Sequence, residues 1–212
     1  MREDLQRLKD SAEGRTVFIL GGGASVTPEM IERLNQPKTK VFCLNSSVKF
    51  ITNPIAVLWC DDSWAAINKD LLDSYKFPKF AVRSNGMNYI AKDIRTQSNA
   101  TVITKTGEMG YDYKIDHVKG NNSGCHAINL LVNCKAKNIV LVGFDMYSTG
   151  NKAHFHTDYT YAIRPSVYGD LFVPAMEKLN KELRDTGTFT KIYNTNFASG
   201  LKCFEFRELW DF

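Results

Sequence analysis

Residues 17–25 read VFILGGGAS, so four apolar residues lead directly into three glycines, an alanine and a serine. A short apolar run bounded by glycine is typical of a strand that is buried on both faces. Each glycine costs about 0.5–1 kcal/mol relative to alanine in regular structure, so three in succession indicate a corner that needs bare backbone. Thr27, Pro28 and Glu29 follow, and they have the order of an N-cap, a first-turn proline and a first-turn acid. The stretch therefore predicts a strand, a glycine corner and a helix.

The same alternation continues along the chain. Further strand-like runs occupy residues 40–45, 54–60, 79–85, 100–107, 138–147 and 191–196. Helical patterns occupy residues 4–14, 63–75, 122–138 and 169–185. Strands that are apolar on both faces and alternate with helices predict an α/β fold, with a Rossmann-like, mostly parallel sheet and helices on both of its faces. We expect residues 1–212 to form one such domain, with an irregular, polar and aromatic lid segment at about 148–166.

The composition excludes several classes of protein. Hydrophobic residues make up 43% of the 212 residues and charged residues 24%, which is ordinary for a globular protein. The net charge of +4 permits an anionic ligand without requiring one. No apolar run approaches the roughly 18 residues of a membrane span, and the charged N-terminus lacks a signal-peptide core, so we expect a cytoplasmic protein. The five cysteines form no C-x-x-C pair and are expected to be buried free thiols.

The glycine corner is the first candidate for ligand binding. Ligands of open α/β sheets bind at the carboxyl ends of the strands, which is where Gly22, Gly23 and Ser25 fall. Backbone N–H groups at such a corner can bind a phosphate. The spacing differs from the dinucleotide fingerprint because residue 26 is valine, and no G-K-[ST] follows as in a P-loop. The alternative is a tight turn whose glycines need positive φ.

Polar residues also follow the next two predicted strands. Asn45 and Ser46 come after the second strand, where they either cap the next segment or contact a ligand. Asp61 and Asp62 come after the third. One of these acids can bind Mg²⁺ or a ribose hydroxyl or act as a base, and the alternative is a solvated loop.

Two further groups lie at later strand and helix ends. Asn122, Ser123 and Gly124 open a helix, either as a plain cap or as a second anion site. Asp145 follows the most apolar strand, and a buried acid there either anchors backbone N–H groups or faces the ligand.

The lid segment contains a third kind of candidate. His154 and His156 form an H-x-H pair whose side chains would share one side of a strand, but no third metal ligand is evident nearby, so we expect no metal. Asp158, Tyr161 and Arg164 lie in the same segment. Aromatic rings, a histidine and an arginine suit an active-site lid, and the alternative is a solvated surface loop.

Taken in order, these motifs resemble a known family. A strand ending G-x-G-x-S, a strand ending in Asn, an S-G helix start and a strand reading G-F-D-x-Y resemble the bacterial sialyltransferases of glycosyltransferase family 42. They also resemble the related 6-hydroxymethylpterin diphosphokinase-like proteins. The resemblance covers residues 16–150, with a weaker similarity at 192–206. It implies a Rossmann-type core that binds a nucleotide-activated donor.

The resemblance also implies roles for individual residues. In the sialyltransferases the matching positions hold a cytidine nucleotide sugar, and the position of Tyr147 contacts its phosphate and assists the leaving group. The chain has glycine at position 22, where the family has asparagine, and Ser-Val-Tyr at 166–168, where the family has its catalytic histidine. We therefore expect His156 or His154 to act as the general base. The positions implied to face the donor are Gly22, Gly23, Ser25, Asn45, Ser123 and Gly124.

These observations predict a transferase that uses a nucleotide-activated donor, most simply a sialyltransferase-like glycosyltransferase that requires no cofactor. The acceptor is a saccharide or a nucleic acid. The alternatives are a Mg²⁺-dependent diphosphokinase-like enzyme that uses Asp61 or Asp62, and a nucleotide- or nucleic-acid-binding protein without turnover. The aromatic tail at 204–212 packs either on the core or on a partner subunit, so a homo-oligomer is also an expectation.

Overall fold

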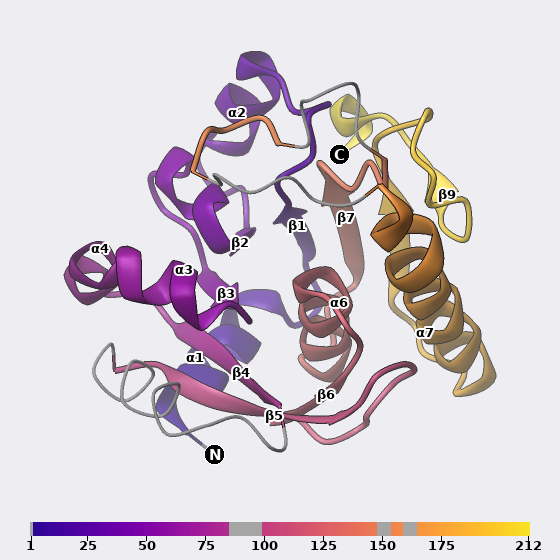
Figure 1. Ribbon diagram of the computed structural model, residues 1–212, viewed down its shortest axis with the longest axis horizontal. Helices are drawn as coiled ribbons and strands as arrows, with labels where there is room; N and C mark the ends of the chain where they lie inside the picture. The colour runs from indigo at the N-terminus through magenta and orange to yellow at the C-terminus, as the bar shows by residue number, and fades with distance from the viewer. Residues whose placement is uncertain (1, 85–98, 148–153, 159–164) are drawn as a thin grey trace.

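The structure, a computed structural model, describes residues 2–84, 99–147, 154–158 and 165–212 (Figure 1). Nine strands within these residues form one sheet in the order β6-β5-β4-β3-β2-β1-β7-β8-β9, and every pair is parallel. The predicted Rossmann-like parallel sheet is therefore confirmed. The strands are β1 (Thr16–Leu20), β2 (Val41–Leu44), β3 (Ala56–Trp59), β4 (Lys79–Ser84), β5 (Thr101–Gly107), β6 (His117–Lys119), β7 (Asn138–Val142), β8 (Lys191–Asn194) and β9 (Glu205–Phe206).

Helices cover both faces of this sheet, as the apolar strands require. The α-helices are α1 (Glu3–Ala12), α2 (Pro28–Leu34), α3 (Asp62–Ile67), α4 (Lys69–Ser74), α6 (Ser123–Asn133) and α7 (Val173–Asp185). Two 3₁₀ segments, η1 (Asn45–Phe50) and η3 (Leu209–Asp211), and a π-helical turn, η2 (Tyr168–Phe172), complete the helical elements of the described residues. None of the helices in these ranges is long and apolar enough to cross a membrane.

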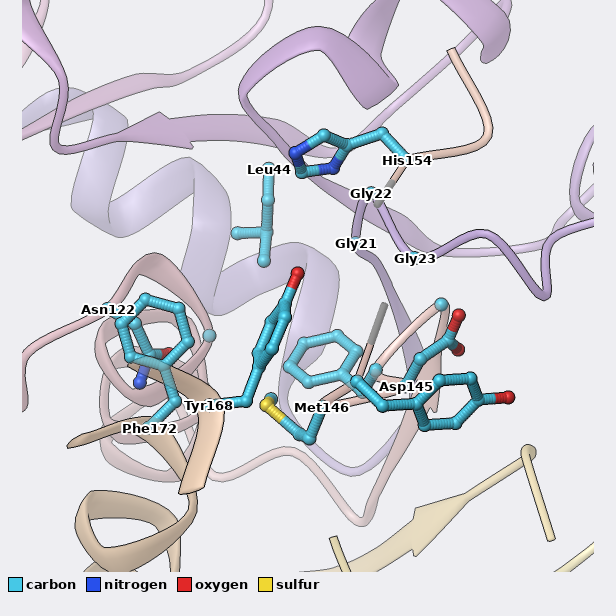
Figure 2. Close-up of a pocket in the computed structure, with 14 residues that line it drawn as sticks. Gly21, Gly22, Gly23, Leu44, Asn122, Asp145, Met146, His154, Tyr168 and Phe172 are labelled. Carbon is cyan, nitrogen blue, oxygen red and sulfur yellow. The ribbon is translucent and has the colours of Figure 1, made fainter. Parts of the chain in front are cut away.

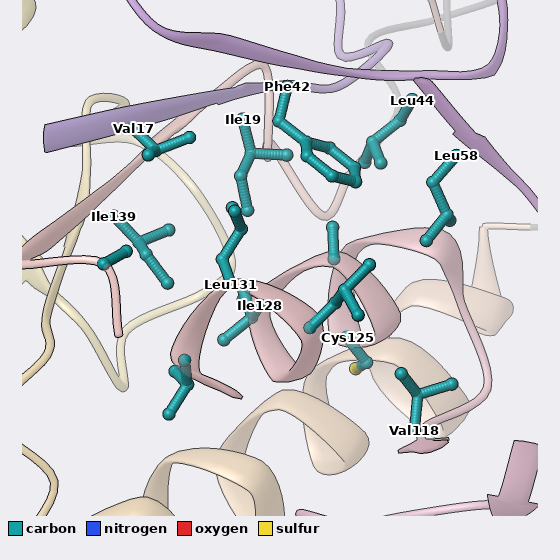
Figure 3. Close-up of a cluster of buried hydrophobic side chains, with 14 of the residues drawn as sticks. Val17, Ile19, Phe42, Leu44, Leu58, Val118, Cys125, Ile128, Leu131 and Ile139 are labelled. Atoms are coloured by element: carbon teal, nitrogen blue, oxygen red, sulfur yellow. The ribbon is translucent and has the colours of Figure 1, made fainter. Parts of the chain in front are cut away.

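The strands divide their side chains between two hydrophobic cores. Val17 and Ile19 of β1 belong to a core shared with α1, α6 and α7, which Figure 3 shows in part. Phe18 and Leu20 point to the opposite face, where α2, η1, α3 and α4 pack. Successive residues of a strand face opposite sides of the sheet, so strands with no polar face need helices on both.

The strand order reverses at β1, which fixes the place of the ligand crevice. β1 pairs with β2 on one side and with β7 on the other. The connections that leave these two strands therefore diverge, and they open a crevice at the carboxyl ends of β1 and β7. The glycine corner follows β1 and the GFDMY sequence (residues 143–147) follows β7, so both lie at this crevice.

Three local features differ from the sequence prediction. The helix expected at 63–75 is divided into α3 and α4 at Asn68, whose side-chain amide donates to the Trp64 carbonyl at 2.9 Å. The helix expected at 169–185 begins as the π-helical turn η2, and Pro174 stands in the first turn of α7, where its missing N–H costs nothing. β6 and β9 are short outer strands that the sequence pattern did not indicate.

Candidate functional site

A pocket of about 130 Å³ lies at the carboxyl ends of β1 and β7 (Figure 2). Its walls come from five places in the sequence: the glycine corner, the end of β2, the start of α6, the loop after β7 and the η2 turn. His154 also lines it. The pocket therefore lies at the ligand-binding edge that the sequence predicted. Its lining residues are Gly21, Gly22, Gly23, Leu44, Asn122, Gly124, Gly143, Phe144, Asp145, Met146, Tyr147, His154, Tyr168 and Phe172.

Two of the three corner glycines are explained by close packing against the loop after β7. A Cβ atom on Gly21 would lie 2.8 Å from the Gly143 carbonyl oxygen, and one on Gly23 would lie 2.6 Å from the same oxygen. The N–H groups of Gly21 and Gly23 donate to the carbonyls of Val142 and Gly143 at 2.8 and 2.9 Å. The left-handed glycine is Gly143, with a φ of +73°, and none of the three corner residues has positive φ. The corner thus needs glycine for contact between backbones, and not for a tight turn.

Asp145 joins this corner to the segment after β8. Its buried carboxylate accepts hydrogen bonds from the Ser25 backbone N–H at 2.8 Å and from the Ser25 hydroxyl. The Asn196 side-chain amide donates to the same carboxylate at 2.9 Å. These contacts make Asp145 the structural anchor that the sequence offered as one of two interpretations, and they hold the Ser25 side chain against it.

Gly22 serves a different contact, with residues 154–158, which we call the cover segment. The Phe155 N–H donates to the Gly22 carbonyl at 3.0 Å. A Cβ atom on Gly22 would lie 2.8 Å from Nδ1 of His154 and 3.4 Å from Nε2 of His156. The two imidazole rings stack with their centroids 5.2 Å apart. The absent side chain at position 22 therefore makes room for both histidines above the corner.

Burial sets the protonation state of these histidines. It lowers the pKa of His156 to about 4, and the neighbouring His154 lowers it further while Asp158 opposes the change. Burial also lowers the pKa of His154, against a hydrogen bond with the Gly22 backbone that raises it. Both rings are therefore neutral at pH 7 and are weaker bases than a free imidazole, and Nδ1 of His156 accepts a hydrogen bond from the Asp158 N–H at 3.4 Å.

The cover segment is fastened to η1. Lys49 forms an ion pair with Asp158, and the Phe50 and Phe155 rings lie 4.8 Å apart. The pKa of Asp158 is lowered: burial opposes this, but hydrogen bonds from Lys49 and Ser46 outweigh it. The predicted site residue Ser46 is buried, and its hydroxyl accepts from the Trp64 indole N–H at 2.7 Å. Ser46 thus connects the cover segment to α3 and does not line the pocket.

The opposite wall comes from η2, which sequence reasoning missed. Tyr168 and Phe172 are four residues apart, and the π-helical turn brings both into the pocket with their rings 5.9 Å apart. In Figure 2 the Tyr168 hydroxyl points toward Leu44 and His154. Burial raises the pKa of Tyr168, and the charge of Asp145 adds to this, so the hydroxyl stays protonated at neutral pH. The sequence signal that could have found this wall is the pair Tyr168 and Phe172 shortly before Pro174. A proline there disturbs the helix, and π-helical turns often occur at functional sites.

The start of α6 forms the pocket floor next to η2. The Asn122 side chain caps the helix by accepting from the Cys125 N–H at 3.0 Å. A Cβ atom on Gly124 would lie 2.5 Å from the Phe144 ring, so glycine allows the ring to pack on the helix. Ser123 is absent from the pocket lining, and its hydroxyl instead donates to Sγ of Cys60 at 3.3 Å.

The remaining predicted residues are divided between the site and its surroundings. Tyr147 lines the pocket, and Tyr161 lies outside the described residues. Asn45 has a left-handed φ of +49°, and its buried side-chain oxygen accepts no hydrogen bond from the described part of the chain. Asp61 caps α3 by accepting from the N–H groups of Ser63 at 2.9 Å and Trp64 at 3.2 Å.

Two observations bear on metal binding and on relatives. Within the ranges that the structure describes, no three histidine, cysteine, aspartate or glutamate side chains are grouped so as to hold a metal ion. No protein-family model and no curated protein matches this chain. The function must therefore be argued from the site itself.

Proposed function

We propose that the protein is a transferase that binds a nucleotide-activated donor between the glycine corner and η2, and that it transfers a glycosyl group. One observation carries this proposal. At the switch point of a parallel sheet, where phosphorylated ligands bind in such folds, two tyrosines and a neutral histidine line a single pocket.

Each of these groups has a role in glycosyl transfer. Departure of a nucleotide leaves negative charge on its phosphate, which the hydroxyls of Tyr147 and Tyr168 stabilise by donating hydrogen bonds. The raised pKa of Tyr168 keeps its proton available for that bond. We assign His154 as the group that accepts the proton of the acceptor hydroxyl: its ring is neutral at pH 7, while burial, which lowers its pKa, makes it a weaker base than a free histidine. His156 stacks on His154 and is the second candidate for the base.

The size of the pocket adds a condition. Pockets that bind drug-sized ligands usually measure about 300–1,000 Å³. The 130 Å³ available here fits one ring or one phosphate group and not a whole nucleotide sugar. The rest of the donor must therefore lie outside this pocket, or the cover segment must move when the donor binds. Among the described residues, such a movement would break the segment's contacts with Lys49, Phe50 and Gly22.

The Mg²⁺-dependent diphosphokinase remains the second candidate, and the carboxylates weigh against it. Such an enzyme needs carboxylate oxygens for Mg²⁺ and phosphate. Asp145 has its oxygens engaged by Ser25 and Asn196, and Asp61 uses one oxygen to cap α3. Metal-free stabilisation can use the Tyr168 hydroxyl, which points toward His154 in Figure 2.

A turnover assay separates these functions. Purified protein is incubated with a panel of nucleotide sugars, with EDTA or with Mg²⁺, and release of free nucleotide is measured with and without saccharide acceptors. We expect release from at least one donor in EDTA. Tyr168→Phe should lower that rate by about 100–1,000-fold through loss of one hydrogen-bond donor. Tyr113→Phe is the matched control because Tyr113 is 79% exposed and does not line the pocket. Consumption of ATP only with Mg²⁺ would favour the diphosphokinase instead.

A further inference from the structure

Cations gather at the edge of the sheet opposite the pocket. Because all the strands are parallel, their amino ends share this edge. Arg15 precedes β1, Lys40 precedes β2, Lys137 precedes β7 and Lys191 is the first residue of β8. These strands are neighbours in the order β2-β1-β7-β8, and neighbouring strands lie about 4.8 Å apart. The four cations therefore form a row across the sheet, which we call the basic edge.

Backbone hydrogen bonds fix the order of the row. The Lys137 N–H donates to the Arg15 carbonyl at 2.9 Å, and the Lys191 N–H donates to the Lys137 carbonyl at 3.0 Å. On the other side of β1, the Phe18 N–H donates to the Lys40 carbonyl at 2.8 Å. Arg15, Lys137 and Lys191 are exposed and Lys40 is half-buried, so a ligand in solution can reach the row.

A hollow of about 430 Å³ lies at one end of the basic edge. None of its described lining residues is an aspartate or a glutamate. Its cations come from two loops and the last turn of α2, and they are Arg15, Arg33, Lys38 and Lys40. The Arg33 guanidinium is held in place because it donates to the Thr39 hydroxyl at 3.3 Å and to the Phe212 carbonyl.

The described residues supply no acid to neutralise these charges. The ion pairs within the described ranges include none of the cations concerned, which are Arg15, Arg33, Lys38, Lys40, Lys137 and Lys191. Glu13, the acid nearest to Arg15 in the sequence, lies 3.9 Å from Lys9 and 3.8 Å from Lys135. A group of cations without acids creates a positive potential that attracts anions to this edge.

An exposed aromatic ring lies at the same edge. Phe189 is 97% exposed, so folding gains almost nothing from burying its side chain. It comes two residues before Lys191, and the intervening Thr190 hydroxyl donates to the Ala136 carbonyl at 2.7 Å. This bond holds the segment against the residues that precede β7. Proteins that bind single-stranded nucleic acids combine cations, which contact phosphates, with accessible rings, which stack on bases.

We propose that the basic edge binds a single strand of RNA or DNA, with the phosphates along the cations and one base on Phe189. An extended chain fits a row of charges, whereas a compact anion would use the hollow alone. One stacked base and one or two phosphates are too few contacts to hold a single nucleotide, so the surface requires a strand. Phosphate contacts carry no sequence information, so binding is largely independent of sequence. The site does not depend on the proposed transferase function, whose pocket lies at the other edge of the sheet.

The direct test is fluorescence anisotropy of a labelled oligouridylate of about 12 nucleotides, titrated with the protein at several salt concentrations. Four phosphate contacts predict that the logarithm of the association constant falls with the logarithm of salt concentration with a slope of about −3. Lys40→Gln and Lys191→Gln should each reduce that slope by about 0.7. Lys69→Gln is the matched control, because it loses the same charge in α4, where Lys69 pairs with Asp73, and it should leave the slope unchanged.

A second variant separates base stacking from charge. Phe189→Ala should weaken oligouridylate binding by about fivefold or more and leave the salt slope unchanged, because it removes a ring and no charge. Equal affinity of the wild type, Lys40→Gln, Lys191→Gln and Phe189→Ala for the oligonucleotide would overturn the proposal. Binding of inorganic tripolyphosphate without binding of the oligonucleotide would also overturn it, since the cations would then serve a compact anion.

Discussion

Replacing Gly23 by alanine tests whether the glycine corner exists to let two backbones meet. The new Cβ atom would lie 2.6 Å from the Gly143 carbonyl oxygen and 2.7 Å from Cγ of Asp145. Both neighbours are held in place, because Gly143 follows a central strand and Asp145 is fixed by Ser25 and Asn196. The loop after β7 must therefore shift by several tenths of an ångström.

The expected cost can be worked out from these contacts. Overpacking of a well-packed site costs about 1–3 kcal/mol. Weakening of the Gly23 N–H bond to Gly143 and of the Ser25 bonds to Asp145 adds about 1 kcal/mol. The reduced entropy of the unfolded chain returns about 0.4–1 kcal/mol. The net destabilisation is about 1–3.5 kcal/mol, and its central value of about 2 kcal/mol lowers Tm by about 4–8 °C for a chain of this size.

Urea unfolding and calorimetry of three alanine variants measure this effect with its controls. Gly169→Ala should raise the free energy of unfolding by about 0.4–1 kcal/mol, because nothing lies within 4 Å of its Cβ position and alanine lowers the entropy of the unfolded chain. Gly22→Ala meets the His154 ring at 2.8 Å and the His156 ring at 3.4 Å and no backbone atom, so we expect it to cost about 1 kcal/mol, less than Gly23→Ala. If Gly23→Ala is as stable as Gly169→Ala, the close approach of the two backbones does not explain the glycine corner.

Three further predictions concern titration, the anchor and the cover segment. Since the pKa of His126 falls from 6.5 to about 4 on folding, its share of the stability is present above pH 6.5 and is lost toward pH 4. That share is about 3 kcal/mol, and urea unfolding between these pH values should show a smaller loss in His126→Asn than in the wild type. Asp145→Asn replaces one carboxylate oxygen by an NH₂ group, which cannot accept the hydrogen bonds from Ser25 and Asn196. This variant should destabilise the protein by about 1–3 kcal/mol in the same assay, and unchanged stability would refute the role of Asp145 as an anchor. Lys49→Ala removes the ion pair with Asp158 and should change stability by less than about 1 kcal/mol, yet speed amide hydrogen exchange at Phe155; an unchanged exchange rate would show that the pair does not fasten the segment.

The sheet could be predicted from the sequence because its central strands are apolar on both faces and end in polar residues or glycine. Such runs have one stable place, inside a parallel sheet covered by helices. The helix caps at Thr27 and Asn122 could also be predicted, because each depends only on residues within the next few positions, and the structure confirms both. The short strands β6 and β9 could not be predicted, since they are held by pairing with a neighbour and not by their own pattern.

The site was predictable in place but not in detail. The strand ends identified the edge of the sheet. Seven of the predicted residues line the pocket, and they include one of the two predicted histidines: Gly22, Gly23, Asn122, Gly124, Asp145, Tyr147 and His154. Tyr168 and Phe172 were missed because the π-helical turn changes which side chains share a face. The position of the cover segment depends on contacts with Lys49 and Gly22, more than a hundred residues away in the sequence, which no local pattern encodes.

Isothermal titration calorimetry with nucleotides and nucleotide sugars tests the central claim most directly. The wild-type protein should bind at least one of them with a one-to-one stoichiometry in EDTA. Phe172→Ala should weaken that binding by about tenfold or more, because the ring forms a wall of the pocket. Phe189→Ala should bind as the wild type does, because Phe189 is 97% exposed and outside the lining. Absence of binding across the panel, or equal binding by Phe172→Ala, would contradict the assignment of this pocket to a nucleotide-activated donor.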